Sequence, residues 1–444
     1  MRRFSNNIPI LLLLLCLFGA ISGAFSPAQA ATSKTATATA LVSDASNAFG
    51  FRLYQQLSQQ DLNKNLFISP LSISIALAMT YNGANGQTKD EMAKTLGWQA
   101  LTLPQLNTGF QSFDKLLHPA GGYATVELAN ELVVQQKFHL LPDFVQRCKD
   151  SFHAGLDTAD FINHEPAARK KINGWVGQKT HGKINAILPT PLSPLTRLVL
   201  IDALYFKDYW QNQFYLSHTT SQPFTCADGK TKIVPMMEQS KQFAYLATDK
   251  FQAIRLPYLQ DGYSMDIFLP AKSSTLSSFL KQLTPAQWQS WQRQFNMRSG
   301  TIRLPRFKAD YQLDLKQPLI SMGMKAPFAE FKADFSGMSK QPLFISNVFH
   351  QTTLDVSEQG TEASAVTAAR NFPLSKEPAV SAPFIMTVDH PFFFAIRAKN
   401  GMILFLGSIA SPRPLEVTYK SPPGYRKPGF ISPPTRKDRH QRPG

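Results

Sequence analysis

The sequence predicts an α+β protein in which one large mixed domain takes up most of the 444 residues. Helix and strand patterns alternate over residues 46–411, with no repeat and no Gly/Ser-rich linker to separate two domains. Hydrophobic residues make up 43% of the chain, which is enough for a sizeable core. Because the helical patterns lie mostly in the first half, we expect helices packed against large sheets.

The clearest helix is expected to begin near residue 70. Ser69 is a suitable N-cap and Pro70 fits the first turn, and apolar residues then recur at helical spacing until Gly83. Thr88 and Glu91 have the spacing of a capping box, which predicts the start of a second, short helix. Two consecutive helices are therefore expected early in the domain.

The strand patterns that come next are in several cases apolar on both faces, as in strands that are covered by helices. We therefore expect them inside large sheets. The expected strands are Tyr123–Val134, Arg197–Phe206, Phe251–Leu256, Tyr263–Leu269, Thr301–Leu304, Phe392–Arg397 and Ile403–Ile409.

The N-terminus has the pattern of a signal peptide over residues 1–30. Two arginines precede the apolar run Ile10–Phe18, and Ala28-Gln29-Ala30 supplies the small residues of a cleavage site. The run is shorter than the roughly 20 residues of a membrane span, although an uncleaved anchor is the alternative. We expect a secreted or periplasmic protein in which residues 31–45 form a flexible lead-in.

Two cysteines, Cys148 and Cys226, remain after removal of the signal peptide. Two cysteines do not make a disulfide framework, so we expect two free, partly buried thiols, with a single bridge as the alternative. The core must then hold together without covalent cross-links.

The net charge of +16 is unevenly distributed along the chain. The signal peptide carries two positive charges and the Pro-rich tail, residues 412–444, a net six, which leaves +8 for the body. The composition of the tail is typical of a disordered segment. Contact with a polyanion or the cell envelope and a purely solubilising role explain the tail equally well, and we expect no specific nucleic-acid partner.

Residues 358–369 form a run of small residues directly after a strand-like segment. Read with period 2, one face of residues 361–369 is small and uncharged, and every charge falls on the other face. Such a segment can remain a solvated loop or enter the middle of a sheet. The alternatives are a linker or a piece of helix, because alanine favours helix over strand.

Short motifs spread over residues 45–412 together resemble the serpin family, the conformationally active protease inhibitors. The motifs include Asn65-Leu66-Phe67-Ile68-Ser69-Pro70, Gly83-Ala84-Asn85-Gly86-Gln87-Thr88, Asn173-Gly174-Trp175-Val176, Ala203-Leu204-Tyr205-Phe206, Val234-Pro235-Met236-Met237, Leu304-Pro305-Arg306-Phe307, Ala333-Asp334-Phe335-Ser336-Gly337 and Phe405-Leu406-Gly407. The resemblance implies a serpin fold, in which helices pack on a large central mixed sheet, with smaller sheets and an exposed reactive loop at about residues 358–388.

The resemblance also implies which residues of the loop act. By the usual spacing of the family, the bait bond falls at Leu374–Ser375, with Lys376 and Arg370 as rival positions. A leucine before the cut suits the hydrophobic pocket of a chymotrypsin- or elastase-like enzyme. The residues that resemble the hinge of an inhibitory member are Glu358, Gly360, Thr361, Glu362, Ala363, Ser364 and Ala365.

The implied function is suicide-type inhibition of a serine, or alternatively a cysteine, endopeptidase through a covalent acyl complex. A non-inhibitory serpin that acts as a binding protein or chaperone is the main alternative. We expect no enzyme, since the chain lacks a Gly-x-Ser-x-Gly elbow, a phosphate-binding loop and a His-Glu-x-x-His motif. We also expect no cofactor, no metal and a monomer.

Further residues resemble the family's sheet-opening region, where the loop inserts. They are Ser69, Ser72, Asp202, Trp210, Arg306 and His350. We expect an ion pair between Arg306 and Glu358; ordinary surface charge is the alternative. Asp202 stands where many relatives carry asparagine, and could pair with a protonated His350 and make opening of the sheet sensitive to pH. A hydrogen-bonded core histidine is the simpler interpretation.

Overall fold

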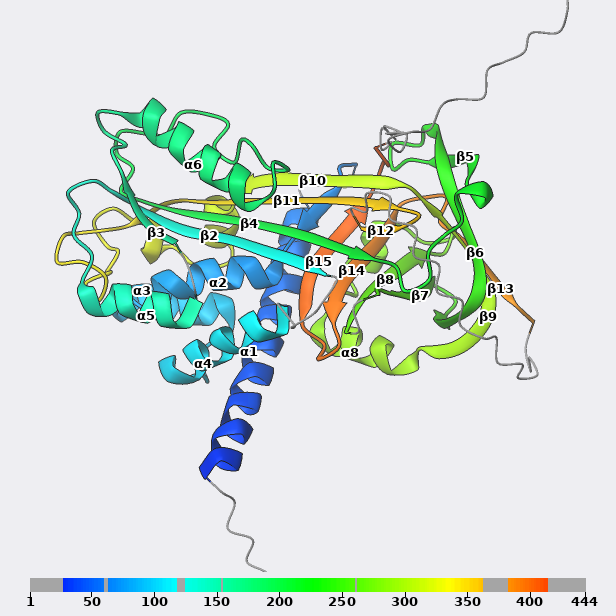
Figure 1. Ribbon diagram of the computed structural model, residues 1–444, viewed down its shortest axis with the longest axis horizontal. Coiled ribbons are helices and arrows are strands. Elements are labelled where there is room, and N and C mark those ends of the chain that lie inside the picture. Colours follow the sequence, from blue (N-terminus) through cyan, green and yellow to red (C-terminus); the bar gives the residue numbers. More distant parts are fainter. Residues whose placement is uncertain are drawn as a thin grey trace, which may run out of the picture.

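The computed structural model describes residues 27–59, 63–117, 124–152, 155–259, 262–361 and 382–413. These residues form two sheets with helices packed against them (Figure 1), which confirms the α+β prediction. The expected strands are all present, at bounds that shift by a few residues.

A six-stranded mixed sheet runs through one half of the molecule (Figure 1). Its order is β10-β11-β12-β4-β2-β3, and β11 also pairs directly with β4. The pairs β11–β4 and β2–β3 are parallel, whereas the others are antiparallel. The strands are β2 (Thr125–Gln135), β3 (Gly155–Ala159), β4 (Leu198–Tyr209), β10 (Phe307–Asp314), β11 (Ile345–Ser357) and β12 (Gly360–Thr361).

A nine-stranded sheet makes up much of the other half, in the order β1-β15-β14-β8-β7-β6-β9-β13 with β5 paired to β6. Its strands are β1 (Leu66–Ile68), β5 (Thr220–Thr225), β6 (Thr231–Ala247), β7 (Phe251–Pro257), β8 (Tyr263–Pro270), β9 (Asn296–Pro305), β13 (Phe384–Thr387), β14 (Phe392–Ala398) and β15 (Ile403–Ile409). Several of these strands are buried along their whole length, as their apolar sequences predict.

Helices cover both faces of the six-stranded sheet (Figure 1). Helices α1 to α5 lie on one face, and α6 crosses the other face alone. The helices are α1 (Pro27–Ser58), α2 (Pro70–Tyr81), α3 (Gly86–Leu96), α4 (Leu103–Leu117), α5 (Pro142–Phe152), α6 (Glu165–Lys179), α7 (Leu276–Leu280), α8 (Pro285–Gln294) and α9 (Lys316–Ser321), with short 3-10 turns η1 (Leu216–His218) and η2 (Ala326–Phe328).

The two faces of the sheet bury two separate apolar clusters. The large cluster joins α1 to α5 to both sheets, and the small one lies between α6 and strands β2 and β4. In the small cluster, Ile172 and Val176 of α6 pack over Val133, Val199 and Ile201. Because this cluster is small, α6 is bound to the sheet by much less apolar area than the opposite layer.

The first predicted helix start is confirmed and the second is wrong. Ser69 caps α2, and its side chain accepts a hydrogen bond from the Ser72 N–H at 3.2 Å. Helix α3 begins at Gly86 instead, so Thr88 and Glu91 do not form a capping box. The Glu91 carboxylate accepts backbone N–H groups of another segment, at Lys325 (2.7 Å) and Ala326 (2.6 Å). Glu91 therefore binds a segment that is distant in the sequence, and does not bind the start of its own helix as the spacing predicts.

The expected flexible lead-in, residues 31–45, lies within α1. From Ala38 onward this part of the helix packs on α4, where Ala38 and Val42 are buried against Gly109. Thr39 Oγ1 also lies 2.6 Å from Ser112 Oγ. The Ala/Thr-rich stretch is therefore part of a helix that packs on α4 through small side chains. The local sequence does not reveal this contact.

Two other expected boundaries also differ. The final part of the expected loop, residues 384–387, is strand β13, which pairs in parallel with β9. The expected tail begins two residues later than predicted, because Pro412 is buried and the Arg413 C=O accepts the Lys308 N–H. The proposed signal peptide up to residue 26 and the tail beyond Arg413 lie outside the described residues.

Cys148 and Cys226 are both free and buried, as expected. Burial raises the pKa of the Cys148 thiol to about 12. Among the described residues, no helix is long and apolar enough to cross a bilayer, and no three His, Cys, Asp or Glu side chains are grouped as metal ligands.

Candidate functional site: the hinge and the seam of the six-stranded sheet

The segment that the sequence predicts as the hinge, which we continue to call the hinge, begins inside the six-stranded sheet. Gly360 and Thr361 form strand β12, which lies between β11 and β4 at one end of the sheet (Figure 1). Thr361 pairs with Val356 of β11 on one side and with Asp208 of β4 on the other. Beyond this point β11 and β4 pair directly and in parallel, from Thr353–Tyr205 to Ile345–Leu198. We call this β11–β4 boundary the seam.

Only glycine fits at position 360. Its φ is +151°, a conformation that other residues rarely adopt. A Cβ at this position would lie 2.2 Å from the Asp208 carbonyl oxygen and 2.6 Å from the Tyr209 Cα. Gly360 is therefore required by a close backbone contact with β4, in addition to the freedom it gives the chain at a pivot.

We call the residues that hold the start of the hinge the hinge cluster. Arg306 Nε donates to both carboxylate oxygens of Glu358 at 2.7 Å, and the two side chains are 8% and 9% exposed. The Thr219 hydroxyl donates to the same carboxylate at 2.5 Å. The expected Arg306–Glu358 ion pair is confirmed, and its burial excludes ordinary surface charge.

Aromatic residues complete the hinge cluster. Trp210 Nε1 donates to the Ser357 carbonyl at 2.9 Å, and the Trp210 ring stacks on Tyr258 with centroids 4.5 Å apart. The Tyr258 hydroxyl lies 2.7 Å from Thr361 Oγ1. Thr361 is thereby fixed through its side chain as well as through its backbone, and it is fully buried.

A second group, which we call the mid-sheet cluster, lies halfway along the seam. His350 of β11 and Asp202 of β4 face one another in register, with His350 Nδ1 2.7 Å from Asp202 Oδ2. The Ser72 hydroxyl donates to Asp202 Oδ1, and the Ser69 N–H donates to His350 Nε2 at 3.2 Å. All four residues are fully buried.

These contacts fix the state of His350. Because Nε2 accepts the Ser69 N–H, the ring proton is on Nδ1, where it is donated to Asp202. A protonated ring would lose the bond to Ser69, so the geometry favours a neutral, hydrogen-bonded core histidine over a charged partner of Asp202. The group is also no Ser-His-Asp triad, since Ser72 donates to the aspartate and not to the histidine.

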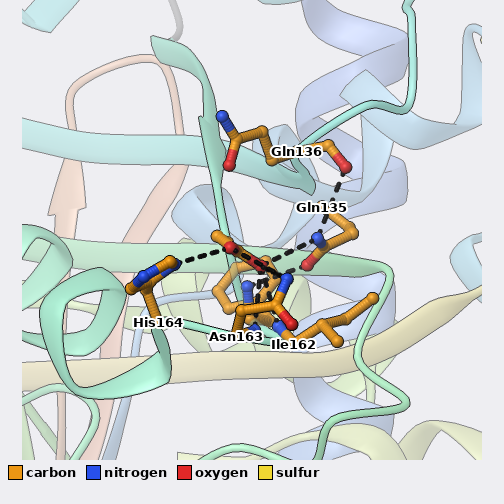
Figure 2. Close-up of polar contacts among 7 residues, drawn as sticks. Gln135, Gln136, Ile162, Asn163 and His164 are labelled. Carbon is orange, nitrogen blue, oxygen red and sulfur yellow. Dashed lines mark hydrogen bonds and ion pairs between the residues drawn. The ribbon is translucent and has the colours of Figure 1, made fainter.

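Helix α6 packs over β2 and β4, and the residues just before it, Ile162, Asn163 and His164, lie close to Gln135 of β2 (Figure 2). The Asp160 carboxylate accepts the N–H groups of Ile162 and Asn163 and contacts His164 Nδ1 at 2.8 Å. Gln135 of β2 donates to the same carboxylate at 3.3 Å. The hydrogen bond from Asn163 and that from His164 hold the pKa of Asp160 well below its usual range.

Glu131 of β2 also lies beside α6 and has an altered pKa. Burial, together with the nearby Asp157 carboxylate, raises its pKa to about 7, against an opposing pull from Lys171 and Lys179 of α6. Lys171 itself pairs with Asp157 at 2.5 Å. Glu131, whose pKa lies near neutral pH, is thus placed between the sheet and α6.

The structure places the predicted sheet-opening residues in two groups, with Trp210 and Arg306 in the hinge cluster and Ser69, Ser72, Asp202 and His350 in the mid-sheet cluster. Sequence reasoning missed three residues: Thr219, Tyr258 and Asn130, whose side-chain Oδ1 accepts from the Ser72 hydroxyl at 3.2 Å. No local signal marks them, because each becomes a partner only through the fold. Hinge residues Glu362, Ala363, Ser364 and Ala365 and the bait residues Leu374 and Ser375 lie outside the described residues.

The fold places a two-residue strand, β12, between β11 and β4 at one end of a six-stranded sheet that helices cover on both faces. A family model described as "Serpin (serine protease inhibitor)" matches residues 44–412. The chain belongs to the serpin family, and the predicted membership and fold are confirmed.

Among curated proteins, the chain is similar to the leukocyte elastase inhibitor of Bos taurus. The two are 37% identical over 389 residues, which cover 84% of this chain and 99% of the relative. Among solved structures, human thyroxine-binding globulin matches with a TM-score of 0.76 and 28% identity over 84% of this chain and 99% of that one. Native protease nexin-1 with heparin matches with a TM-score of 0.74 and 30% identity over 84% and 100%.

Proposed function

We propose that this serpin is a suicide-type inhibitor of serine endopeptidases with a chymotrypsin- or elastase-like pocket, and that cysteine endopeptidases are a second class of target. The observation that carries this proposal is β12, because the first residues of the hinge already occupy the position between β11 and β4 that a longer strand would extend. The elastase inhibitor among its relatives supports the class of target.

In the proposed mechanism, the protease cuts the bond Leu374–Ser375. Its nucleophile attacks the Leu374 carbonyl, Ser375 leaves as the new amino terminus, and Leu374 stays bound as an acyl-enzyme. Residues from Glu362 onward then extend β12 along the seam and separate β11 from β4. Roughly ten new backbone hydrogen bonds at about 0.5–1.5 kcal/mol each give on the order of 10 kcal/mol, which is comparable to the stability of a whole domain.

A panel of purified proteases tests the proposal. Incubation with an elastase or chymotrypsin should give an SDS-stable complex, and the released C-terminal peptide should begin at Ser375. A peptide that begins after Lys376 or Arg370 would instead place the bait bond there and indicate a trypsin-like target. Complete loss of the inhibitor without any stable complex would contradict suicide inhibition.

The hinge assignment has a separate test at Thr361. The Thr361 side chain is fully buried against Tyr258, so an arginine there must bury a charge at a cost of several kcal/mol. We expect Thr361→Arg to be cleaved as a substrate, while Thr361→Ser, which keeps the hydroxyl, should still form the complex. A gel that shows equal yields of SDS-stable complex for both variants would contradict the assignment.

A non-inhibitory binding or chaperone role is the second candidate, favoured by the similarity to thyroxine-binding globulin. The two roles predict different behaviour after cleavage of the loop. An inserting loop should raise the melting temperature of the cleaved protein markedly. A binding protein whose loop does not insert should melt at the same temperature before and after cleavage.

We also propose that the protein is exported through the signal peptide at residues 1–30 and works as a monomer. The basic tail would contact a polyanion or the cell envelope, which its net positive charge supports. N-terminal sequencing of the exported protein checks the expected cleavage after Ala30. A protein that still begins at Met1 would contradict it.

A further inference from the structure

The two strands at the ends of the expected reactive loop are held differently. At the N-terminal end, β12 lies between β11 and β4, whereas at the C-terminal end β13 is an edge strand of four residues whose partner is β9 (Figure 1). Phe384, the first residue of β13, lies in register with Gly300 of β9. An edge strand this short has few backbone hydrogen bonds, so its side chains must contribute to its position.

The Phe384 side chain is packed into the sheet. It is 7% exposed, and its ring stacks on the ring of Tyr245 of β6, with centroids 3.8 Å apart and planes at 9°. Phe243, also of β6, meets the Phe384 ring edge-on at 6.1 Å. A Cβ at Gly300 would lie 2.3 Å from Phe384 Cδ1, so the close approach of the ring requires glycine there. Strands β6 and β9 thus form a close-fitting site for this one aromatic side chain.

Arg298 of β9 adds a polar contact to the same group. Its guanidinium lies over the Tyr245 ring, 5.4 Å from the centroid, and its Nη2 donates to the Ala382 carbonyl at 3.3 Å. A cation over an aromatic face is attracted to it, and a charged donor strengthens a hydrogen bond. Arg298 therefore holds the backbone two residues before Phe384. We call Tyr245, Arg298, Gly300 and Phe384 the β13 anchor.

The residues that follow β13 are fixed as well. The Val388 N–H donates to the Arg303 carbonyl at 2.8 Å, and the Asp389 carbonyl accepts the Thr225 N–H, also at 2.8 Å. With the β13 anchor before the strand and these bonds after it, β13 is held at both ends. A shift of Phe384 requires contacts with both β6 and β9 to break.

The sequence places the proposed bait bond closer to β13 than to β12. Nine residues, 375–383, separate Leu374 from Phe384, whereas twelve residues, 362–373, separate Thr361 from Leu374. At 3.3–3.6 Å per residue, Leu374 can lie at most about 35 Å from Phe384 and about 45 Å from Thr361. The shorter connection sets the narrower limit on where the bond can lie, so the position of the bond depends more on β13.

We propose that the β13 anchor positions the bait bond for the protease and sets the rate at which the protease captures the loop. The inference rests on the proposed inhibition and assigns a role to residues outside the hinge cluster. If the anchor is loosened, the bond samples more positions and meets the active site of the protease in a productive geometry less often. After the cut, the segment that inserts is no longer joined to β13, so the anchor takes no part in insertion. Phe384 and Arg298 are thus positioning residues that act through the chain.

The main test compares Phe384→Ala with Ile385→Ala. Ile385 is the next residue of the same strand and is 61% exposed, so its truncation leaves the β13 anchor intact. Loss of elastase or chymotrypsin activity on a small fluorogenic substrate gives both the rate constant of capture and the stoichiometry of inhibition. We expect Phe384→Ala to be captured about tenfold more slowly than Ile385→Ala, at an unchanged stoichiometry. The hinge variant Thr361→Arg should give the converse result, a lower yield of complex at a similar rate of cleavage.

Two further variants change the β13 anchor by other routes. Gly300→Ala places a methyl group against the Phe384 ring and should slow capture as Phe384→Ala does. Arg298→Ala removes the hydrogen bond to Ala382 without emptying the buried site, and should slow capture about threefold. Melting curves show which variants fold, and Arg298→Ala decides the question if Phe384→Ala does not fold.

Two results would overturn the inference. The first is a capture rate for Phe384→Ala and Arg298→Ala that equals the rate for Ile385→Ala. The second is a raised stoichiometry at an unchanged capture rate, because the anchor would then act on insertion. A failure of the proposed inhibition is seen separately, as cleavage of the unaltered protein without a stable complex. The rates of cleavage of the variants would still compare their anchors in that case.

Discussion

The hinge cluster and the mid-sheet cluster hold the same seam by different chemistry. At the hinge, a buried ion pair between Arg306 and Glu358 is joined by a stacked tryptophan and tyrosine. At mid-sheet, Asp202 is bound by a neutral histidine and a serine in a fully buried network. The first cluster fixes the segment that leads into the loop, whereas the second ties β4 and β11 directly to α2.

Under the proposed mechanism, in which β12 lengthens, the two clusters are expected to behave differently. Extension of β12 must separate His350 from Asp202, because the two residues face one another across the seam. The Arg306–Glu358 pair lies before β12 and need not break for the strand to extend. The mid-sheet cluster is therefore expected to resist insertion, and the hinge cluster to set its starting point.

The largest effect is expected from Asp202→Ala. The change leaves the His350 Nδ1–H buried without a partner and leaves the Ser72 hydroxyl with Asn130 alone, and should lower the free energy of unfolding by about 3–5 kcal/mol. Asp202→Asn keeps one acceptor and should lose less. Denaturant melts of the two variants give the comparison, and equal stabilities would show that the network does not hold the seam.

A smaller effect is expected from Glu358→Ala. Arg306 remains buried with its charge uncompensated, but its side chain keeps 8% of its surface exposed, against 0% for His350 and Asp202, so we expect a loss of about 2–3 kcal/mol. Glu358→Gln keeps the acceptor for Thr219 and serves as the control. A loss larger than that of Asp202→Ala would reverse the ranking of the two clusters.

The smallest effect is a dependence of stability on pH. It is expected at Glu131, which lies between β2 and α6 and belongs to neither cluster. In the folded protein the Glu131 carboxylate keeps its proton up to a pH of about 7, whereas in the unfolded chain it loses the proton near its ordinary, lower pKa. The free energy of unfolding therefore falls as the pH rises from the lower to the higher pKa. We expect a decline on the order of 1–2 kcal/mol once solvent screening is allowed for.

In Glu131→Gln this decline should disappear. Unfolding free energies at several pH values provide the measurement. A decline that persists in Glu131→Gln would assign the pH dependence of stability to another group.

The sequence predicts much of this site because its motifs lie on regular elements. Ser69 and Pro70 start α2 in place, and the apolar strands carry Asp202 and His350 into register. Short-range patterns fail where a distant partner intervenes. Glu91 binds the segment at Lys325 in place of its own helix start, and the Ala/Thr-rich stretch before residue 46 belongs to α1, which packs on α4 from Ala38 onward.

By itself the sequence determined the α+β class, the family resemblance and the free thiols, since all of these come from local residue patterns. The tertiary structure decided that Gly360 and Thr361 are already paired within the sheet, that His350 is a neutral donor to Asp202, and that Tyr258 and Thr219 secure the hinge. These features depend on side chains that meet from strands far apart in the chain. Their free energy comes from burial and hydrogen bonding between elements, which no local pattern records.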